Sequence, residues 1–346
     1  MAQILFVTAP RKVEITTVPN DPMETGYVRI ESHFMGISAG TELNTYRGGV
    51  NWHSGRDPKT RLFYPDADQQ QWEYPATLGY ANIGRVVEVA PDVTNLSVGD
   101  MVFCNAGHCT PVRYRANQVW RVPKEVDPRA CTFIQLVRTA LNVVQHARLS
   151  LGDTVVVFGL GVVGLLTLQL ARLNGAQRII AFDPIAKRRE MALRFGAHAA
   201  LDPTNTDPGN VVRELNDGRG ADVAIECSAN IVALQQCTRA VGELGRVVLA
   251  SMPNHPAPFH FGMEMHFNAV TIHGANVMKM LPELGPLWDM ERRDAVARQL
   301  LTTMDLLPLI THEFKFADAA NAYDFLDKSP QDVIGAIFRC PAAEKS

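Results

Sequence analysis

The hydrophobic pattern of the chain is densest between residues 154 and 183. A β-branched run from Thr154 to Val157 predicts a buried strand, and apolar residues at helical spacing follow it up to Gly175. A second apolar run, 179–182, predicts another strand that ends directly before Asp183. This order of strand, helix and strand is typical of a parallel α/β sheet.

Three glycines separate the first of these strands from the helix. Gly159, Gly161 and Gly164 have the spacing G-x-G-x-x-G, and Asp183 follows 19 residues after the last of them. Between a strand and a helix, this spacing indicates a dinucleotide site: a tight turn, close approach of a pyrophosphate to the helix N-terminus, and close helix–strand packing. The acid is then expected to face the adenosine ribose. Incidental glycines in a buried unit are the alternative, which the context disfavours.

The rest of the pattern predicts two domains and a short tail. Up to about residue 125 the chain is β-rich, and short strand candidates at 13–17, 27–32, 84–89 and 101–103 lie between Pro, Gly and Asp turns. From about residue 126, strands alternate with helices, with helices at 187–195 and 231–240 and strands at 221–227, 246–250 and 270–275. The tail, with helices near 292–304 and 317–326 and a strand at 333–339, is expected to return to the first domain. The fold class is therefore α/β, with a doubly wound parallel sheet beside a β-rich domain.

Length, charge and cysteine content favour a two-domain protein without a nucleic acid or membrane partner. A length of 346 residues suggests two domains, and a net charge of -3 gives no reason to expect a nucleic acid or membrane partner. The uncharged run 155–171 is shorter than a bilayer span and is interrupted by glycines. The N-terminus lacks the pattern of a signal peptide, and the six cysteines are scattered, which is typical of reduced thiols in the cytoplasm.

Several short phrases occur in an order known from one enzyme family. They are Gly40-Thr41-Glu42-Leu43 before Tyr46-Arg47-Gly48, Gly84-Arg85-Val86-Val87, Val98-Gly99-Asp100, Thr139-Ala140 and Glu226-Cys227-Ser228. Together with the glycine turn, they resemble the medium-chain dehydrogenase/reductase superfamily of alcohol dehydrogenases and quinone reductases. The resemblance implies a GroES-like catalytic domain over 1–125, completed by 276–346, and a Rossmann domain over 126–275. It also implies hydride transfer with a nicotinamide cofactor, to which Thr139, Val163, Arg188 and Ser228 would contribute contacts.

The positions that hold catalytic zinc in this family carry other residues here. Ala39, Tyr80 and Gln135 stand where zinc members have ligands, and Asn44 replaces a nearby histidine. An alanine offers no ligand atom, and a phenol and a neutral amide are poor zinc ligands. Cys104, His108 and Cys109 supply three potential ligands without a clear fourth, which favours a structural or incidental role. We therefore expect no zinc.

Without a metal, hydrogen-bond donors must hold the oxygen whose charge changes. Tyr80 and Thr41 occupy suitable positions, and Gln135 could position the substrate or the nicotinamide carboxamide. A phenol, with a pKa of about 10, can donate a proton at neutral pH. The alternatives are a packing role for Tyr80 and a turn-capping role for Thr41.

A long polar segment between Gly48 and Gly79 is the main addition to the family pattern. Its His53 and Arg56, with Lys59 and Arg61 nearby, could recognise a polar or anionic substrate. A solvated surface excursion or a subunit contact is the alternative. Arg138 and Asn44 are two further candidates for substrate contact.

The first functional hypothesis is a zinc-independent dehydrogenase for a secondary alcohol or ketone of a polyol, cyclitol or sugar-like metabolite. A zinc-free NADPH-dependent enone or quinone reductase and a non-catalytic nucleotide-binding redox sensor are the alternatives. Asp183 favours NAD over NADP, although the basic run 187–189 could bind a 2′-phosphate. A homodimer that pairs through 270–275 is also expected.

Overall fold

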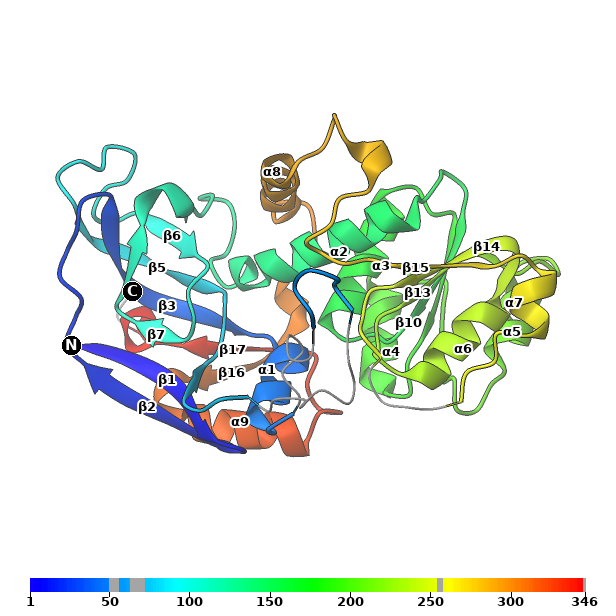
Figure 1. Cartoon of the computed structure of the whole chain (residues 1–346), viewed down its shortest axis with the longest axis horizontal. Helices are drawn as coiled ribbons and strands as arrows, with labels where there is room; N and C mark the ends of the chain where they lie inside the picture. The colour runs from blue at the N-terminus through cyan, green and yellow to red at the C-terminus, as the bar shows by residue number, and fades with distance from the viewer. Residues whose placement is uncertain (50–55, 63–71, 254–257, 345–346) are drawn as a thin grey trace. The chain divides into compact units, whose positions relative to one another are not determined.

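The computed structural model describes residues 1–49, 56–62, 72–253 and 258–344. The chain divides into two compact units (Figure 1). Unit 1 comprises Met1–Phe133 and Leu306–Ser346, and unit 2 comprises Ile134–Asp305. The tail belongs to the first unit from residue 306 onward, whereas the resemblance implied boundaries at 125/126 and 275/276.

Among its described residues, unit 1 contains two sheets. The larger has seven strands, in the order β16-β17-β3-β5-β6-β9 with β8 also paired to β3. Its strands are β3 (Tyr27–Ile37), β5 (Asn82–Val89), β6 (Met101–Cys104), β8 (Val112–Arg115), β9 (Trp120–Arg121), β16 (Ile310–Lys315) and β17 (Gly335–Arg339). The smaller sheet contains β1 (Ala2–Ala9), β2 (Lys12–Val18), β4 (Ala76–Thr77) and β7 (Cys109–Thr110).

Alternating side chains give unit 1 its core. Val28 and Ile30 of β3 are completely buried in one hydrophobic cluster, and Met35 further along the same strand is buried in a second one. The second cluster also receives helices α1 (Ala39–Tyr46) and α9 (Ala319–Lys328), which pack against each other. Because successive side chains of a strand point to opposite faces, β3 contributes to both clusters. The second cluster joins the N-terminal and C-terminal parts of the chain into one unit.

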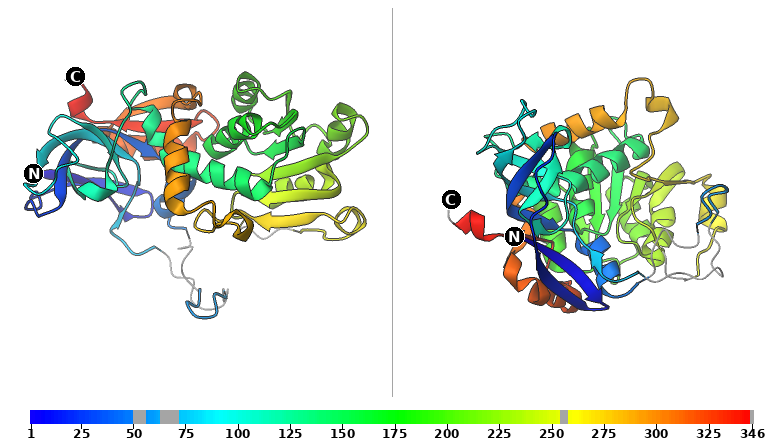
Figure 2. Two further views of the ribbon diagram at one scale, coloured as in Figure 1. Left: turned by 90° about the horizontal axis from the view of Figure 1, so that it is seen from above. Right: turned by 60° about the vertical axis from the view of Figure 1, so that its left-hand side comes forward.

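In the part of the chain that the structure describes, unit 2 contains a six-stranded sheet in which all paired strands are parallel, coloured green to yellow in Figures 1 and 2. The order is β12-β11-β10-β13-β14-β15. The strands are β10 (Thr154–Phe158), β11 (Arg178–Phe182), β12 (Ala199–Leu201), β13 (Ala221–Glu226), β14 (Val241–Leu249) and β15 (Thr271–Gly274). This confirms the predicted α/β fold class, a GroES-like β-rich part plus a Rossmann-like parallel sheet.

The connections of unit 2 are helical. The helices are α2 (Ile134–Ala147), α3 (Val162–Leu173), α4 (Ala186–Arg194), α5 (Pro208–Leu215), α6 (Ile231–Ala240), α7 (Met263–Phe267) and α8 (Met290–Leu300). Helix α3 packs against α2, and α5 packs against α6. In the apolar interior, Phe158 of β10 stacks on Phe182 of β11 with ring centroids 4.8 Å apart. Among the described residues, no helix is both long and apolar enough to cross a bilayer.

Helix α8 belongs to unit 2 because a buried arginine ties it to α2. Arg293 is fully buried, and its guanidinium donates to Asn142 Oδ1 and to the carbonyl of Val277, both at 2.5 Å. A buried cation needs such acceptors, since leaving it unsatisfied costs several kcal/mol. The amphipathic pattern of α8 predicts a helix, but the hydrogen bonds of Arg293 decide which unit it joins.

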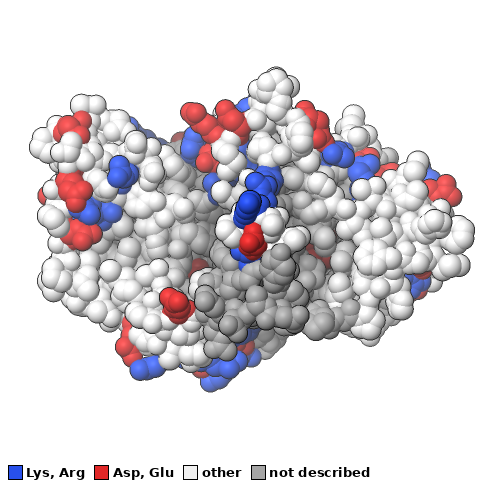
Figure 3. All heavy atoms as spheres, viewed as in Figure 1, with Lys and Arg blue, Asp and Glu red and all other residues white. Residues whose placement is uncertain are grey.

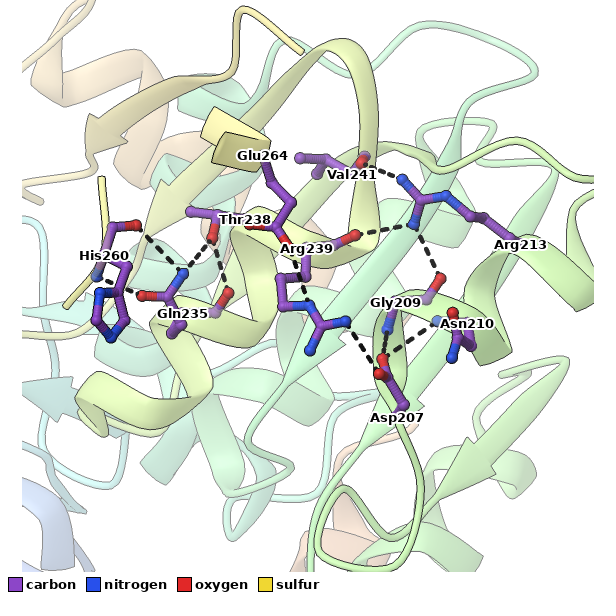
Figure 4. Close-up of polar contacts among 10 residues, drawn as sticks. All are labelled: Asp207, Gly209, Asn210, Arg213, Gln235, Thr238, Arg239, Val241, His260 and Glu264. Carbon is purple, nitrogen blue, oxygen red and sulfur yellow. Dashed lines mark hydrogen bonds and ion pairs between the residues drawn. The ribbon is translucent and has the colours of Figure 1, made fainter. Parts of the chain in front are cut away.

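Two arginines fix helices α5, α6 and α7 to one another (Figure 4). Arg213 Nη1 donates to the carbonyls of Gly209 and Arg239, both at 2.9 Å. Arg239 in turn pairs with Asp207, the N-cap of α5, at 3.0 Å and with Glu264 of α7 at 3.3 Å. Because α6 packs against strands β13 and β14, these contacts also keep α5 and α7 close to the sheet.

Charged side chains of both signs are interspersed over the face shown in Figure 3. This distribution agrees with the small net charge of -3. The described residues on that face form no continuous basic surface of the kind that binds nucleic acid.

Candidate functional site

The glycine turn of unit 2 has the backbone geometry that the sequence predicts. Gly159, directly after β10, has φ +85°, a conformation that side chains other than glycine rarely adopt. A Cβ on Gly164 would lie 1.9 Å from the carbonyl oxygen of Gly159, so helix α3 crosses the turn at a distance that excludes any side chain. A Cβ on Gly161 would meet nothing within 4 Å. The three glycines thus have separate roles.

The start of α3 is suited to an anion. Gly161 is the N-cap and supplies no side-chain acceptor, so the first-turn N–H groups, which include those of Val163 and Gly164, have no capping bond. With the open space beside Gly161, these donors form a cradle that fits the pyrophosphate of a dinucleotide.

Asp183 lies at the end of β11, against this turn. It is 3% exposed, its Oδ2 accepts from the N–H of Leu160 at 2.8 Å, and its Oδ1 accepts from the N–H of Ile185 at 2.8 Å. Arg188 lies 3.8 Å from the same carboxylate. The acid therefore holds the glycine turn in place, a role that its position in the motif does not reveal.

Ser228 lies beside the turn. A Cβ on Gly159 would lie 2.7 Å from both Cβ and N of Ser228. The fully buried carboxylate of Glu226 accepts from the N–H of Ser228 at 2.6 Å and from its hydroxyl at 2.5 Å, and it also accepts from Ser251 Oγ. Sequence reasoning missed Ser251 and the role of Glu226, although an acid at the end of a buried strand is itself a signal.

Gln135, Arg138 and Thr139 are neighbours on α2, which belongs to unit 2. The Thr139 hydroxyl donates to the carbonyl of Gln135 at 3.0 Å, a bond within the helix. Arg138 Nη1 lies 3.3 Å from Asp294 of α8, so this candidate for anion contact already has an acidic partner. All three residues are half-buried.

In unit 1, Tyr80 and Thr41 are brought together. The half-buried Tyr80 hydroxyl is hydrogen bonded to the hydroxyls of Ser38 and Thr41, at the start of α1. Burial raises the pKa of Tyr80 to about 12, and the charge of Glu42 acts in the same direction. Thr41 is exposed, so this group of three hydroxyls is connected to solvent. The sequence analysis missed Ser38.

A buried acid lies behind these hydroxyls. Glu42 is 2% exposed and accepts hydrogen bonds from the N–H of Ser38 at 2.8 Å, from His108 Nε2 at 2.9 Å and from the Tyr323 hydroxyl. Burial alone would raise the pKa of Glu42, but these three partners outweigh it, and the pKa lies below its ordinary value. Glu42 belongs to a motif that the sequence analysis named, but its hydrogen-bond partners could not be predicted from that motif.

The donors at the family's metal positions do not fit catalytic zinc. Ala39 has no ligand atom, and the phenol of Tyr80 stays protonated and is hydrogen bonded to other hydroxyls. Cys104, His108 and Cys109 do not converge on a metal, since the His108 ring is directed to Glu42. Within the described ranges, no group of three or more His, Cys, Asp or Glu side chains is placed to hold an ion.

The added segment is described only in part. His53 lies outside the described residues, and Arg56 is exposed in the described stretch 56–62. Asn44, on α1, is half-buried and covers the backbone of Gly49, where a Cβ would lie 2.2 Å from Asn44 Oδ1. The roles of these three residues in substrate contact therefore stay predictions.

Comparison with known families gives two matches. Residues 25–126 match the family described as "Alcohol dehydrogenase GroES-like domain", and residues 162–290 match the family described as "Zinc-binding dehydrogenase". Among curated proteins, the chain is 29% identical to the D-guloside 3-dehydrogenase of Escherichia coli (strain K12), with 95% of this chain and 97% of that protein covered. It is also 29% identical to the L-threonine 3-dehydrogenase of Pyrococcus abyssi, over 72% of this chain and 78% of that protein.

Solved structures share the fold over almost the whole chain. An oxidoreductase/dehydrogenase of unknown specificity from Escherichia coli superposes with a TM-score of 0.80 at 17% identity, covering 98% of this chain and 99% of that one. The 2R,3R-butanediol dehydrogenase of Bacillus subtilis gives a TM-score of 0.78 at 22% identity, with the same coverage.

The separate roles of the glycines lead to a paired prediction. Gly164→Ala should lower the free energy of unfolding by about 3 kcal/mol, because its methyl group overlaps the Gly159 carbonyl. Gly161→Ala should change stability by less than about 0.5 kcal/mol but weaken NADH binding by about tenfold, since its methyl group fills the space left for the pyrophosphate. Thermal unfolding without nucleotide and fluorescence titration with NADH measure the two effects. Equal destabilisation by both changes would contradict the assignment.

Proposed function

Because the chain belongs to the medium-chain dehydrogenase/reductase superfamily, we propose that it is a zinc-independent, NAD(H)-dependent dehydrogenase. Its substrate would be a secondary alcohol, or the corresponding ketone, of a polar metabolite such as a polyol, cyclitol or sugar derivative. The observation that carries this proposal is the group of three hydroxyls, Ser38, Thr41 and Tyr80, at positions where zinc members of the family have or adjoin a metal ligand.

The roles of the residues follow from their contacts. A bound nicotinamide supplies or accepts the hydride. In ketone reduction, Tyr80 would donate a proton to the oxygen as its charge develops, and Thr41, which is exposed, would pass a proton from solvent to Tyr80. In alcohol oxidation the same protons would move in the opposite direction. A phenol that stays protonated over the neutral range suits the donor role.

The relatives support the class of substrate. The curated relatives named above are dehydrogenases of a guloside and of threonine, and both names indicate oxidation at carbon 3. Asn44, Arg56 and His53 remain our candidates for recognition of the polar substrate in unit 1, and Arg138 is a candidate in unit 2. The half-buried Gln135 is not required for this proposal, but we retain it as a candidate for positioning. A homodimer formed through the edge strand β15 is also proposed.

The test is a panel of polyols, cyclitols and sugar derivatives, assayed by absorbance of the reduced cofactor in both directions. On the best substrate, Tyr80→Phe and Thr41→Ala should each lower kcat by about 100-fold, the scale for loss of a positioned proton donor. An unchanged kcat in Tyr80→Phe, with the fold intact, would return Tyr80 to a packing role.

An enone or quinone reductase is the second candidate, and it is favoured by the same poor donor set for zinc. Hydride addition to a polarised C=C bond needs less stabilisation at oxygen. Turnover of enones with NADPH, without any activity on alcohols, would select it. Nucleotide binding without turnover of any substrate class would instead favour a non-catalytic sensor.

We predict that the active enzyme contains no catalytic zinc. Ala39 and Tyr80 supply no suitable ligand, so activity should persist after dialysis against a chelator, and elemental analysis should find far less than one zinc per chain. A relative that contains zinc serves as the positive control. Zinc near one per chain, with activity lost to the chelator, would overturn the prediction.

The choice between NAD and NADP depends on Asp183. A 2′-phosphate would meet this buried carboxylate, which is unfavourable for two like charges. Two neighbouring cations already have partners here: Arg188 lies near Asp183, and Arg189 donates to the carbonyls of Asp183 and Pro184, both at 2.8 Å, and Lys187 is not free either. We therefore favour NAD.

Cofactor kinetics test this choice. The wild type should prefer NAD, and Asp183→Ala should lose about 1–3 kcal/mol of that preference, the range for a lost buried polar partner. Asp183→Asn is the control, because its amide oxygen can still accept from the backbone N–H of Leu160 while the charge is gone. A wild type that uses NADP better than NAD would show that the basic residues 187–189 set the preference.

A further inference from the structure

We propose that Glu42, His108 and Tyr323 form a positioning network that holds the Tyr80 and Thr41 hydroxyls in place, the task that a metal performs in zinc members of the family. This inference rests on the proposed function, since it assigns the support of the same hydroxyl group. The three residues lie in unit 1 and come from α1, from the loop before β7 and from α9.

The first step concerns the Glu42 carboxylate, both oxygens of which accept hydrogen bonds. Its Oε1 accepts from the N–H of Ser38, the N-cap of α1, at 2.8 Å. This bond resembles the return bond of a capping box, in which an acidic side chain reaches back to the N-cap. Its Oε2 accepts from His108 Nε2 at 2.9 Å and from the Tyr323 hydroxyl. A buried carboxylate is stable only with such donors, so the positions of all three are coupled.

The second step is the fixed position of the His108 ring. The N–H of His108 donates to the carbonyl of Leu78 at 2.9 Å, and its carbonyl accepts from the N–H of Leu5 at 3.0 Å. The ring packs edge-on against Phe338 at 5.1 Å. Its Nδ1 is buried and has no hydrogen-bond partner, so the polar contact that orients the ring is the one between Nε2 and Glu42.

The third step joins the network to Tyr80 from two sides. A Cβ on Gly79 would lie 2.8 Å from the His108 ring, so the ring lies directly on the backbone that precedes Tyr80. Gly79 has φ +87°, and this left-handed turn, like the contact with the ring, excludes a side chain. On the other side, the Ser38 that Glu42 holds by its N–H is hydrogen bonded through its hydroxyl to Tyr80.

The fourth step concerns charge. The negative charge of Glu42 opposes ionisation of the Tyr80 phenol. Ser38 and Thr41 oppose this effect weakly through their hydrogen bonds. The network thus both orients Tyr80 and keeps it a proton donor, which a purely structural salt link would not require.

The test uses Tyr323→Phe and Glu42→Gln in the full-length protein, with Tyr46→Phe as the matched control. Tyr46 stacks on Tyr323 with ring centroids 5.5 Å apart and is equally part of the core, but Glu42 does not accept from it. On the best substrate of the panel, Tyr323→Phe and Glu42→Gln should lower kcat by about tenfold or more and leave KM for NAD unchanged. Tyr46→Phe should stay within about twofold of the wild type.

A second readout does not depend on turnover. The protein is labelled with ¹³C at tyrosine Cζ, and the Tyr80 resonance is assigned by its loss in Tyr80→Phe. Glu42→Gln and Tyr323→Phe should shift this resonance, whereas Tyr46→Phe should not. His108→Gln, which keeps a donor for Glu42, should shift it less than His108→Ala.

The outcomes separate the two proposals. A panel without any turnover contradicts the proposed function, while the Tyr80 resonance still tests the network. A Tyr80 resonance that is unmoved in folded Glu42→Gln and Tyr323→Phe overturns the network, whatever the panel shows. Equal losses of kcat in Tyr323→Phe and Tyr46→Phe would also overturn it, because they would reflect a general loosening of the core.

Discussion

The organisation of unit 1 depends on one buried negative charge. Taking the Glu42 carboxylate out of water is unfavourable by several kcal/mol, and only a full set of donors offsets this. The donors come from the start of α1, from a loop between two sheets and from the C-terminal helix α9. The charge therefore acts as a constraint on three chain segments, and the candidate hydroxyl group lies where these segments meet.

The sequence predicted the elements of the fold better than its boundaries. The helix expected at 231–240 and the strands around Asp183 and Ala221 were found as predicted, because their apolar period is a local property. Helix α8 was assigned to the tail, since amphipathicity shows only that a helix packs and not on what. Its partner is fixed by Arg293, a buried cation that hydropathy alone would place on the surface.

The two candidate sites also differ in how much of their geometry can be predicted from the sequence. The glycine turn lies within one strand–turn–helix unit, so its spacing carries nearly all of its geometry. The network around Glu42 joins residues that are 66 and 281 positions apart in the chain, and no local pattern records such pairs. His108 was considered as part of an incomplete metal motif, and the structure shows it instead as a donor to the acid of a different motif.

Each unit contains a buried carboxylate, Asp183 or Glu42, and the two carboxylates have different kinds of hydrogen-bond donors. In unit 2, Asp183 is buried, and its carboxylate accepts hydrogen bonds from two backbone N–H groups, one of them within the glycine turn. In unit 1, Glu42 accepts hydrogen bonds from the side chains of His108 and Tyr323, and its negative charge raises the pKa of Tyr80. A metal polarises a substrate oxygen by its positive charge, whereas a phenol can do so only while it keeps its proton. The negative charge of Glu42 behind Tyr80 favours the protonated phenol, which can donate, and disfavours the phenolate. A chain with Ala39 and Tyr80 at the metal positions can therefore keep the acid Glu42 without a chemical conflict.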